Sequence, residues 1–325
     1  MRAVGIILAG GNNNRMKELT HKRAVAAMPI AGSYRSIDFA LSNMTNSHIQ
    51  KVAVLTQYNA RSLNEHLNSS KWWNFGRKQG GLYVFTPTIT NDNGYWYRGT
   101  ADAIYQNMDF LKKSHEPYVV IASGDAVYKM DYSKVLQYHI DKKADVTVVC
   151  KEMDPSDDVS RFGTIRMDDD MRITEFEEKP MVTKSNMIST GIYVIRRRLL
   201  IDLIEHAAEE ERFDFVNDVL IRYKNLKKIY GYKIDHYWSN IATVDAYYKT
   251  NMDFLKPEVR NYFFKQDPEI YSKVSDLPPA KYNPGASVKN SLVGSGSIIN
   301  GTVENSVIFK QVFVGNNCVI KNSII

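Results

Sequence analysis

The 325-residue sequence has few cysteines and no long apolar stretch. Its two cysteines, Cys150 and Cys318, stand far apart without the close spacing of metal ligands, so we expect two reduced thiols and no disulfide framework. No run approaches the ~20 apolar residues that a membrane-spanning helix needs. Apolar residues still make up 44% of the chain, which is enough for a sizeable core and argues against disorder.

The N-terminus lacks the features of a signal peptide. Its apolar stretch from Met1 to Ala9 is short and stops at Gly10-Gly11, so we interpret it as a first strand and expect a cytoplasmic protein. The formal net charge of +6 is spread along the chain, and a basic balance suits anionic small molecules such as nucleotides and sugar phosphates. We expect neither nucleic acid nor membrane as a partner.

Runs rich in valine and isoleucine alternate with helical patterns over the first part of the chain. The runs predict buried strands at 4–8, 52–56, 118–122 and 146–150. Helices are predicted near 36–46, 60–67, 101–113, 132–143 and 246–264. This alternation predicts an α/β fold, a Rossmann-like domain with a mostly parallel sheet and helices on both faces. Ligands bind such sheets beyond the carboxyl ends of the strands.

The composition changes after a proline-rich connector at 277–285. Asn290-Ser291, Asn305-Ser306 and Asn322-Ser323 each precede two aliphatic residues, and such short repeated steps predict a parallel β-helix of hexapeptide repeats. We therefore expect an α/β domain at 1–255, a helix and linker at 256–284, and a left-handed β-helix at 285–325. The repeats stop in mid-pattern, and because solenoids need a polar cap, we infer a covering subunit or a longer native chain.

Two strand ends carry residues suited to phosphate chemistry. Leu8-Ala9-Gly10-Gly11 follows the first strand, as a phosphate-binding loop does, and Ser123-Gly124-Asp125 follows a later one. Joining a sugar phosphate to a nucleotide requires backbone amides, cations and a Mg²⁺ held by carboxylates around the reacting phosphorus.

Several further stretches stand in order along essentially the whole chain. They are Leu19-Thr20-His21-Lys22-Arg23-Ala24-Val25, Tyr34-Arg35-Ser36-Ile37-Asp38-Phe39, Trp96-Tyr97-Arg98-Gly99-Thr100, Glu178-Lys179-Pro180 and Thr243-Val244-Asp245. Together with the loop at 10–15, they resemble motifs of bacterial glucose-1-phosphate adenylyltransferases. That family carries a glycine-rich loop, a Leu-Thr-x-x-Arg-Ala-Lys-Pro segment and a Tyr-Arg-x-Ile-Asp-Phe stretch near its N-terminus, so the resemblance implies a nucleotidyltransferase-like domain at 1–255.

The departures from the family pattern lie on one side of the reaction. Asn13 and Asn14 replace a glycine and a threonine of the loop, and Val25 replaces the lysine that lies on the reacting phosphates in the family. Asp125 matches the family's first Mg²⁺-binding acid, but Asn240 stands in place of the second, and an amide oxygen binds Mg²⁺ more weakly than a carboxylate. The resemblance leaves Arg15 and Asp125 as catalytic positions, with Mg²⁺ as cofactor if the chain is active.

Other positions match residues that bind ligands in the family. The resemblance implies nucleotide binding by Leu8, Ala9, Gly10, Gly11, Trp96, Tyr97, Gly99 and Thr100. It implies sugar-phosphate binding by Glu178, Lys179, Ser189, Asp214 and Trp238, and an effector site at Lys22, Arg23 and Arg35. Taken alone, Thr100 is typical of a helix N-cap with Asp102 in the first turn, and Glu178-Lys179 is typical of a surface ion pair.

The pattern favours a non-catalytic or weakly catalytic regulatory subunit, similar to the GlgD-type subunit of bacterial glycogen biosynthesis. The resemblance implies a hetero-oligomer with a catalytic subunit, expected to be a tetramer, with sugar phosphates or nucleotides as effectors. One alternative is an active enzyme that makes ADP-glucose and pyrophosphate from ATP and glucose 1-phosphate. A hexapeptide-repeat acyltransferase is disfavoured because the last histidine, His236, precedes the repeats. A sugar-phosphate sensor without an enzyme partner is a further alternative.

Overall fold

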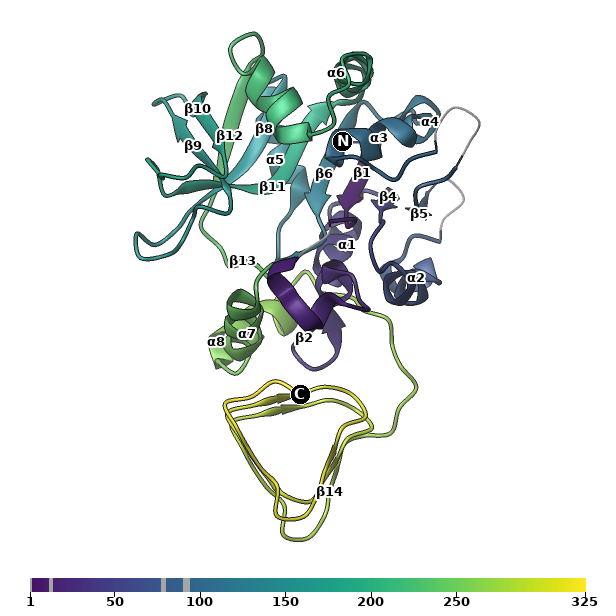
Figure 1. Ribbon diagram of the computed structural model, residues 1–325, viewed down its shortest axis with the longest axis vertical. Helices are drawn as coiled ribbons and strands as arrows, with labels where there is room; N and C mark the ends of the chain where they lie inside the picture. Colours follow the sequence, from purple (N-terminus) through teal and green to yellow (C-terminus); the bar gives the residue numbers. More distant parts are fainter. Residues whose placement is uncertain (1, 12–13, 77–79, 90–93) are drawn as a thin grey trace.

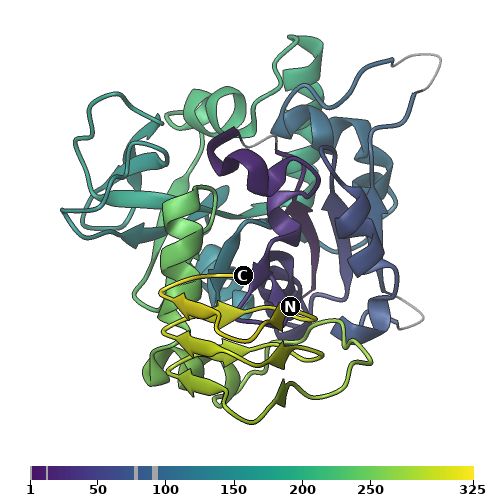
Figure 2. The same cartoon turned by 60° about the horizontal axis from the view of Figure 1, so that its bottom comes forward.

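The computed structural model describes residues 2–11, 14–76, 80–89 and 94–325. The chain forms an α/β domain followed by a triangular coil of short strands (Figure 1). The coil lies against one end of the α/β domain, and its layers stack along that end (Figure 2). No helix in the described ranges is long and apolar enough to cross a membrane.

A nine-stranded sheet forms the centre of the α/β domain. Its path is β10-β9-β11-β6-β1-β4-β5, and β8 pairs with both β11 and β12. β1 pairs in parallel with β4 and β6, whereas β11 runs antiparallel to its neighbours, so the sheet is mixed and mostly parallel around β1. The strands are β1 (Ala3–Leu8), β4 (Lys51–Leu55), β5 (Gly81–Phe85), β6 (Tyr118–Ser123), β8 (Val146–Glu152), β9 (Gly163–Met167), β10 (Ile173–Glu178), β11 (Met187–Arg196) and β12 (Ile229–Ile234).

Helices cover both faces of this sheet, as the sequence predicts. Successive strand residues point to opposite faces; accordingly Ile7 joins one buried apolar cluster and Ile6 another. The helices are α1 (Ser36–Asn46), α2 (Arg61–Leu67), α3 (Thr100–Gln106), α4 (Met108–Lys112), α5 (Tyr132–Asp141), α6 (Arg197–Glu209), α7 (Val244–Asp253) and α8 (Pro257–Phe264). Further helical segments, of other than α-helical type, are η1 (Asn14–Thr20), η2 (Val25–Ala27), η3 (Ser70–Trp73) and η4 (Phe215–Ile221).

Two predicted helices are each divided in the structure. The segment 101–113 forms α3 and α4, because Asn107 leaves the helical conformation at φ −113° and ψ 24°. The Asn107 side chain donates to the carbonyl of Ala103 and to the hydroxyl of Tyr97, so it is committed to fixing this break. The segment 246–264 forms α7 and α8, and Pro257 begins α8, where its missing N–H is tolerated.

The C-terminal strands form three parallel faces, consistent with the predicted left-handed β-helix (Figure 1). Ile299, Val303, Ile308 and Val314 fill its interior. The asparagines of the repeated phrase share a left-handed backbone, with φ between 41° and 47°, which asparagine tolerates better than most residues. The strands are β14 (Lys281–Tyr282), β15 (Ser287–Lys289), β16 (Leu292–Val293), β17 (Ile298–Ile299), β18 (Thr302–Glu304), β19 (Val307–Ile308), β20 (Phe313–Val314) and β21 (Val319–Lys321).

A third apolar cluster joins the two parts of the chain. Phe254, which follows α7, and Phe263 in α8 are buried in it. Phe309 and Ile324 of the β-helix pack against it. The hydroxyl of Tyr248 donates to the carbonyl of Asn322 at 2.8 Å. The β-helix is therefore fixed against the α/β domain by apolar contact as well as by the linker.

Two small strand pairs complete the fold. β2 (Pro29–Ile30) pairs with β3 (Tyr34–Arg35), and β7 (Ala126–Tyr128) pairs with β13 (Trp238–Asn240).

Close packing between coils predicts a sharp difference between two glycines of the β-helix. A Cβ at Gly301 would lie 2.4 Å from the carbonyl oxygen of Cys318, whereas a Cβ at Gly315 would make ordinary contacts with the Cys318 Sγ at 3.6 Å and a Phe313 ring carbon at 3.8 Å. We predict that Gly301→Ala lowers the stability of the chain by about 1–3 kcal/mol through overpacking, and that Gly315→Ala leaves it nearly unchanged. Thermal unfolding of both variants measures the difference; equal midpoints would contradict the packing.

Candidate active-site cleft and anion pocket

The two predicted phosphate-site loops lie side by side. β1 and β6 are neighbours in parallel register, with Leu8 opposite Ser123, and the Gly124 N–H donates to the carbonyl of Leu8 at 3.0 Å. A side chain at Gly124 would press on Ala9 and Ala26, so the loops approach closely. The structure thus brings Leu8, Ala9, Gly10 and Gly11 next to Asp125. Asn12 and Asn13 lie outside the described residues, and Asn14 begins η1.

Gln57, which sequence reasoning missed, holds the predicted nucleotide segment 96–100 against these loops. Its side-chain oxygen accepts from the Tyr97 N–H at 2.7 Å, and its Nε2 donates to the Tyr97 carbonyl at 3.3 Å. The neighbouring Trp96 is exposed and lies 5.6 Å from the Tyr58 ring, measured between ring centroids. Because Gln57 follows the carboxyl end of β4, its place in the sequence is the only signal that marks it.

The N-cap interpretation of Thr100 is wrong. Gly99 is the N-cap of α3, and Thr100 is the first helical residue. The Thr100 hydroxyl instead accepts from the Phe215 N–H at 2.9 Å, which ties α3 to η4. Asp102 does lie in the first turn; it is buried, and it accepts from the Arg98 N–H at 2.8 Å. The Asp102 carboxylate therefore fixes the backbone of Arg98, within the nucleotide segment 96–100, to the first turn of α3.

Asp125 and Asn240 come together at the edge of the small β7–β13 pair. Asn240 lies opposite Ala126 in the register, and the Ile241 N–H donates to the Asp125 carbonyl at 2.9 Å. The Ser123 hydroxyl donates to Asp125 Oδ1 at 2.5 Å. The Asn240 side-chain oxygen accepts from the Ala242 N–H at 3.0 Å. The fold thus places the retained acid and the replaced acid in one half-buried position.

Arg161 is a cation at this position that sequence reasoning missed. Its Nη1 lies 3.5 Å from Asn240 Oδ1 and 3.5 Å from Thr243 Oγ1, and its guanidinium lies over the Phe162 ring at 4.6 Å. Burial lowers the pKa of Arg161, and the charge of Asp125 opposes that shift while the charge of Arg15 adds to it. Arginine stays protonated at any such pKa, so Arg161 places a positive charge near Asp125.

This donor set does not fit a Mg²⁺ centre of the two-carboxylate kind. Mg²⁺ prefers a compact octahedron of oxygen ligands with carboxylates among them. Here one carboxylate faces an amide oxygen that already accepts from a backbone N–H and lies beside a guanidinium. In the described ranges, no group of three or more His, Cys, Asp or Glu side chains could hold a metal ion.

Val25, in place of the expected lysine, is part of an apolar cluster. It is 8% exposed and shares the third cluster with Met16, Val127 and Ile241. These cluster residues lie close to Asp125 and Asn240, since Val127 is in β7 and Ile241 follows β13. The position therefore supplies packing and no charge.

Three of the predicted sugar-side residues, Ser189, Glu178 and Asp214, lie near Tyr193. Ser189 Oγ lies 3.2 Å from the Tyr193 hydroxyl. Burial raises the pKa of Tyr193, and the nearby charges of Glu178 and Asp214 raise it further. The buried indole N–H of Trp238 has no hydrogen-bond partner among the described residues, so this donor is available to a ligand.

Lys179 and Asp214 have local partners as well. The Lys179 ammonium lies 3.0 Å from Glu178 Oε1, in a half-exposed ion pair, and the backbone of Lys179 has φ +48°. Asp214 caps η4 by accepting from the Asn217 N–H at 2.7 Å. The structure therefore shows the local roles of these residues; their role in ligand binding stays a prediction.

A second cavity, of about 570 Å³, lies between the α/β domain and the β-helix. Arg23 and Arg35 line it as predicted, whereas Lys22 is exposed and outside the lining. Lys273 and Lys310 also line it and were missed, because one belongs to the linker and the other to the β-helix. Burial lowers the pKa of Arg35 and of Lys310, and the neighbouring arginine charges add to both shifts. The carboxylates of Glu65 and Asp276 line the cavity too, so four cations face two acids, and the remaining positive charge favours an anion.

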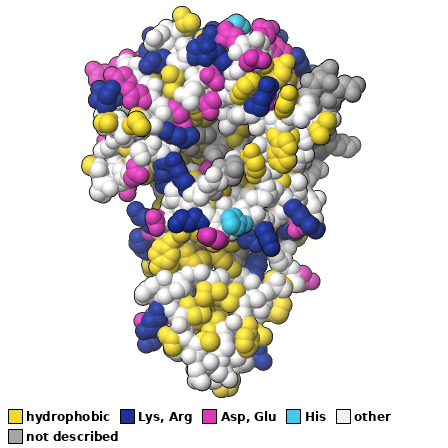
Figure 3. All heavy atoms as spheres, viewed as in Figure 1, with side chains coloured by type: hydrophobic (Ala, Val, Ile, Leu, Met, Phe, Trp, Pro, Cys, Tyr) yellow, Lys and Arg dark blue, Asp and Glu magenta, His cyan; other side chains and the backbone are white. Residues whose placement is uncertain are grey.

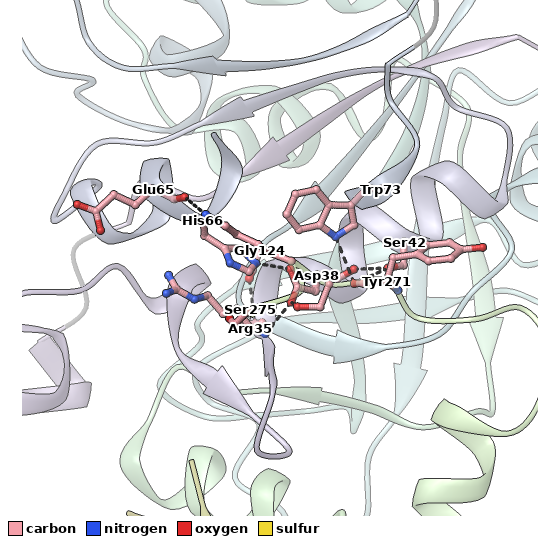
Figure 4. Close-up of polar contacts among 12 residues, drawn as sticks. Arg35, Asp38, Ser42, Glu65, His66, Trp73, Gly124, Tyr271 and Ser275 are labelled. Carbon is pink, nitrogen blue, oxygen red and sulfur yellow. Dashed lines mark hydrogen bonds and ion pairs between the residues drawn. The ribbon is translucent and has the colours of Figure 1, made fainter. Parts of the chain in front are cut away.

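A buried hydrogen-bond network forms the inner wall of this cavity (Figure 4). Asp38 lies at its centre; it is fully buried and accepts from the Arg35 N–H at 2.8 Å and from the Ser272 hydroxyl at 2.6 Å. His66 Nε2 lies 2.6 Å from Asp38 Oδ1. The Trp73 indole donates to the Tyr271 carbonyl at 3.2 Å. The linker to the β-helix is thereby attached to α1 beside the cavity.

Comparison with known proteins gives consistent matches over the chain. A nucleotidyl transferase family profile matches residues 4–257, and a GlmU-like, C-terminal hexapeptide profile matches residues 278–325. A glucose-1-phosphate adenylyltransferase of Clostridium botulinum (strain Alaska E43 / Type E3) is 42% identical over 325 residues, which cover 99% of this chain and 84% of that protein. The Thermosipho melanesiensis protein of the same name is 40% identical over 320 residues, covering 98% and 77%. That of Geobacillus stearothermophilus is 39% identical over 323 residues, covering 98% and 83%.

The double contact of Gln57 with Tyr97 predicts a measurable effect on the nucleotide segment. In Gln57→Leu both hydrogen bonds are lost, each worth about 0.5–1.5 kcal/mol, so local opening becomes about tenfold more frequent. We predict faster chymotryptic cleavage at Tyr95 to Tyr97. Gln137→Leu, which removes an amide from the exposed surface of α5, is the control. Cleavage at the control rate would show that Gln57 does not hold the segment.

Proposed function

We propose that this chain, which belongs to the glucose-1-phosphate adenylyltransferase family, is a non-catalytic or weakly catalytic regulatory subunit. It assembles with a catalytic member of that family and modulates it, in glycogen biosynthesis. The observation that carries the proposal is the cleft's acid side, where an amide and a guanidinium stand around one carboxylate. The sugar side keeps its polar residues.

The physical reason is the charge that adenylyl transfer needs. The reaction joins two anions, and the protein must neutralise the developing charge on the α-phosphorus with fixed cations. Nucleotidyltransferases generally use Mg²⁺ for part of this task. Val25 offers no charge, and Asn240 removes one of the two expected carboxylates. Loss of one such electrostatic group typically lowers the rate by ~10²–10³, and here two are replaced.

Assembly is supported by apolar side chains on the outside of the β-helix. Phe313 and Val319 are 67% and 64% exposed, and Ile298, adjacent to Phe313 in the register, is 37% exposed. Figure 3 shows apolar side chains gathered on the β-helix, with several Lys and Arg side chains along the band above it. Apolar surface of this kind marks interaction sites. Ile298 and Phe313 lie on the β14–β17–β20 face, whereas Val319 belongs to β21 on a neighbouring face. We assign the β14–β17–β20 face to contact with another subunit of a hetero-oligomer.

Regulation is supported by the cavity at the domain junction. Arg23, Arg35, Lys273 and Lys310 contribute positive charge from the α/β domain, the linker and the β-helix. An anion bound there contacts all three parts and can therefore change how the β-helix lies on the domain. Phosphate-bearing metabolites, either sugar phosphates or nucleotides, are the ligand class that this cavity suits.

One second function has a specific observation in its favour. Asp125 and Arg15 are retained, and Arg161 adds a cation beside them, so an active enzyme that makes ADP-glucose from ATP and glucose 1-phosphate is the competing proposal. Such an enzyme would need Arg15 and Arg161 to supply the positive charge of the missing lysine and of the metal ion that the missing carboxylate would help to hold.

Turnover by the purified chain separates the two proposals. With ATP, glucose 1-phosphate and Mg²⁺, we predict pyrophosphate release at least ~10²-fold slower than by a catalytic member of the family from the same organism. Mixed with that enzyme, the chain co-elutes with it and changes its kinetics. Rapid turnover by the lone chain, or separate elution of the two proteins, would contradict the regulatory role.

Restoring the family residues tests the site assignment in the same assay. Val25→Lys with Asn240→Asp returns an ammonium and a carboxylate to the cleft, and the lysine stem can pack along the apolar cluster while its head reaches out. We expect pyrophosphate release to rise. Asn225→Asp with Leu226→Lys introduces the same charges at exposed positions and is the matched control. No gain over this control would count against the assignment.

The junction cavity predicts a regulatory variant. Lys310→Gln removes an ammonium that lines the cavity and that otherwise donates to Ser275 Oγ at 3.2 Å. Because a hydrogen bond to a charged group is worth about 1.5–3 kcal/mol, we predict that the mixed assembly needs about tenfold more effector, tested with glucose 6-phosphate and AMP. Lys321→Gln removes an exposed ammonium paired with Glu304 on β21. Equal responses of the two variants would exclude the cavity as the effector site.

A further inference from the structure

A guanidinium stands beside Asn240, where a two-carboxylate centre has its second acid. Two carboxylates make such a centre negative, and a divalent cation then balances it. Here Asn240 is neutral, and Arg161 Nη1 lies 3.5 Å from its side-chain oxygen. The carboxylates of Asp125, Asp158 and Asp157 act on Arg161, but Asp158 is exposed and accepts from the Ser160 N–H, and Asp157 lies 3.8 Å from the Lys249 ammonium. A fixed protein cation therefore already stands beside the replaced acid.

The geometry of Arg161 leaves donors for a ligand. Its Nη1 makes two contacts of 3.5 Å, at the outer limit of hydrogen bonding. Neither its Nε nor its Nη2 has a hydrogen-bond partner among the described residues. Stacking on Phe162 at 4.6 Å, and the edge-on packing of Phe162 against Trp238 at 5.6 Å, restrict the plane of the guanidinium. A planar, fixed fork of N–H donors suits two oxygens of a phosphate group.

We propose that Arg161 takes the place of the metal ion in this cleft, so that the chain binds phosphorylated ligands there without a divalent cation. The ligand class is a nucleotide or sugar phosphate whose phosphate group lies between Arg161 and the loop after β1. The choice of ligands rests on the proposed function, whereas the independence from metal rests on the geometry of Arg161 and Asn240. Arg161 is a binding residue in this proposal and performs no chemical step.

Competition between Arg161 and a metal ion follows from Asn240. The amide oxygen that a metal would coordinate already accepts from the Ala242 N–H at 3.0 Å and lies within 3.5 Å of the guanidinium. A divalent cation beside Asp125 would repel Arg161 and would have to take this oxygen from two donors. Divalent metal should therefore add little to ligand affinity.

Calorimetric titration of the full chain tests this proposal. ATP, ADP-glucose and glucose 1-phosphate are titrated separately, in EDTA and in millimolar MgCl₂, which distinguishes nucleotide from sugar-phosphate binding. We expect at least one ligand to bind in EDTA, with an affinity that Mg²⁺ changes by less than about twofold. Since charge-assisted hydrogen bonds are the strong ones, Arg161→Gln should weaken that binding by about tenfold or more. Arg161→Lys, which keeps charge but loses the fork, should fall between.

Arg166→Gln is the matched control. Arg166 lies on the adjacent strand β9, half-exposed and paired with Glu175 at 3.6 Å, and its replacement should leave binding unchanged. Thermal unfolding confirms that each variant folds. No binding in EDTA, a tenfold or greater gain with Mg²⁺, or unchanged binding by Arg161→Gln in EDTA would each overturn the proposal. Rapid turnover would overturn the regulatory role and leave the metal-independent binding intact, so the two failures are distinguishable.

Discussion

The balance of charge at the carboxyl end of β6 is the constraint on which the account of this cleft depends. Asp125 is held there by the strand register and by the Ile241 N–H, and Asn240 and Arg161 meet beside it. A carboxylate pair would attract a metal ion, whereas a guanidinium beside an amide offers N–H donors to an anion directly. The same scaffold can therefore retain a ligand while losing much of its power to activate it.

The rest of the fold connects this cleft to the β-helix. Val25 and Ile241, beside the cleft, belong to the same apolar cluster that Phe309 and Ile324 of the β-helix pack against. The basic cavity lies at the junction, and Asp38, behind its lining residues Arg35 and His66, anchors the linker through Ser272. A subunit that binds one anion in the cleft and another at the junction has a continuous packed route between them. Packed side chains of this kind are one medium through which two sites can be coupled.

Local patterns were sufficient to predict most of the fold, because they report on local rules. The strands at 4–8 and 52–56 and the helix at 36–46 agree with the structure to about a residue, and the repeated Asn-Ser phrase identified the coil. The break at Asn107 was missed because it depends on a hydrogen bond to Tyr97 from outside the helix. Thr100 was misread for a similar reason: its partner, Phe215, is distant in the sequence. Arg161 and Lys310 carried no motif, and only the folded chain places them at the cleft and the cavity.

The most direct test of the central claim is a crystal structure of the chain with ADP-glucose and Mn²⁺, with the metal located by its anomalous scattering. The account predicts a diphosphate in contact with the Arg161 guanidinium and no anomalous peak between Asp125 and Asn240. A well-ordered Mn²⁺ coordinated by Asp125 and the ligand, with Arg161 turned away, would contradict it.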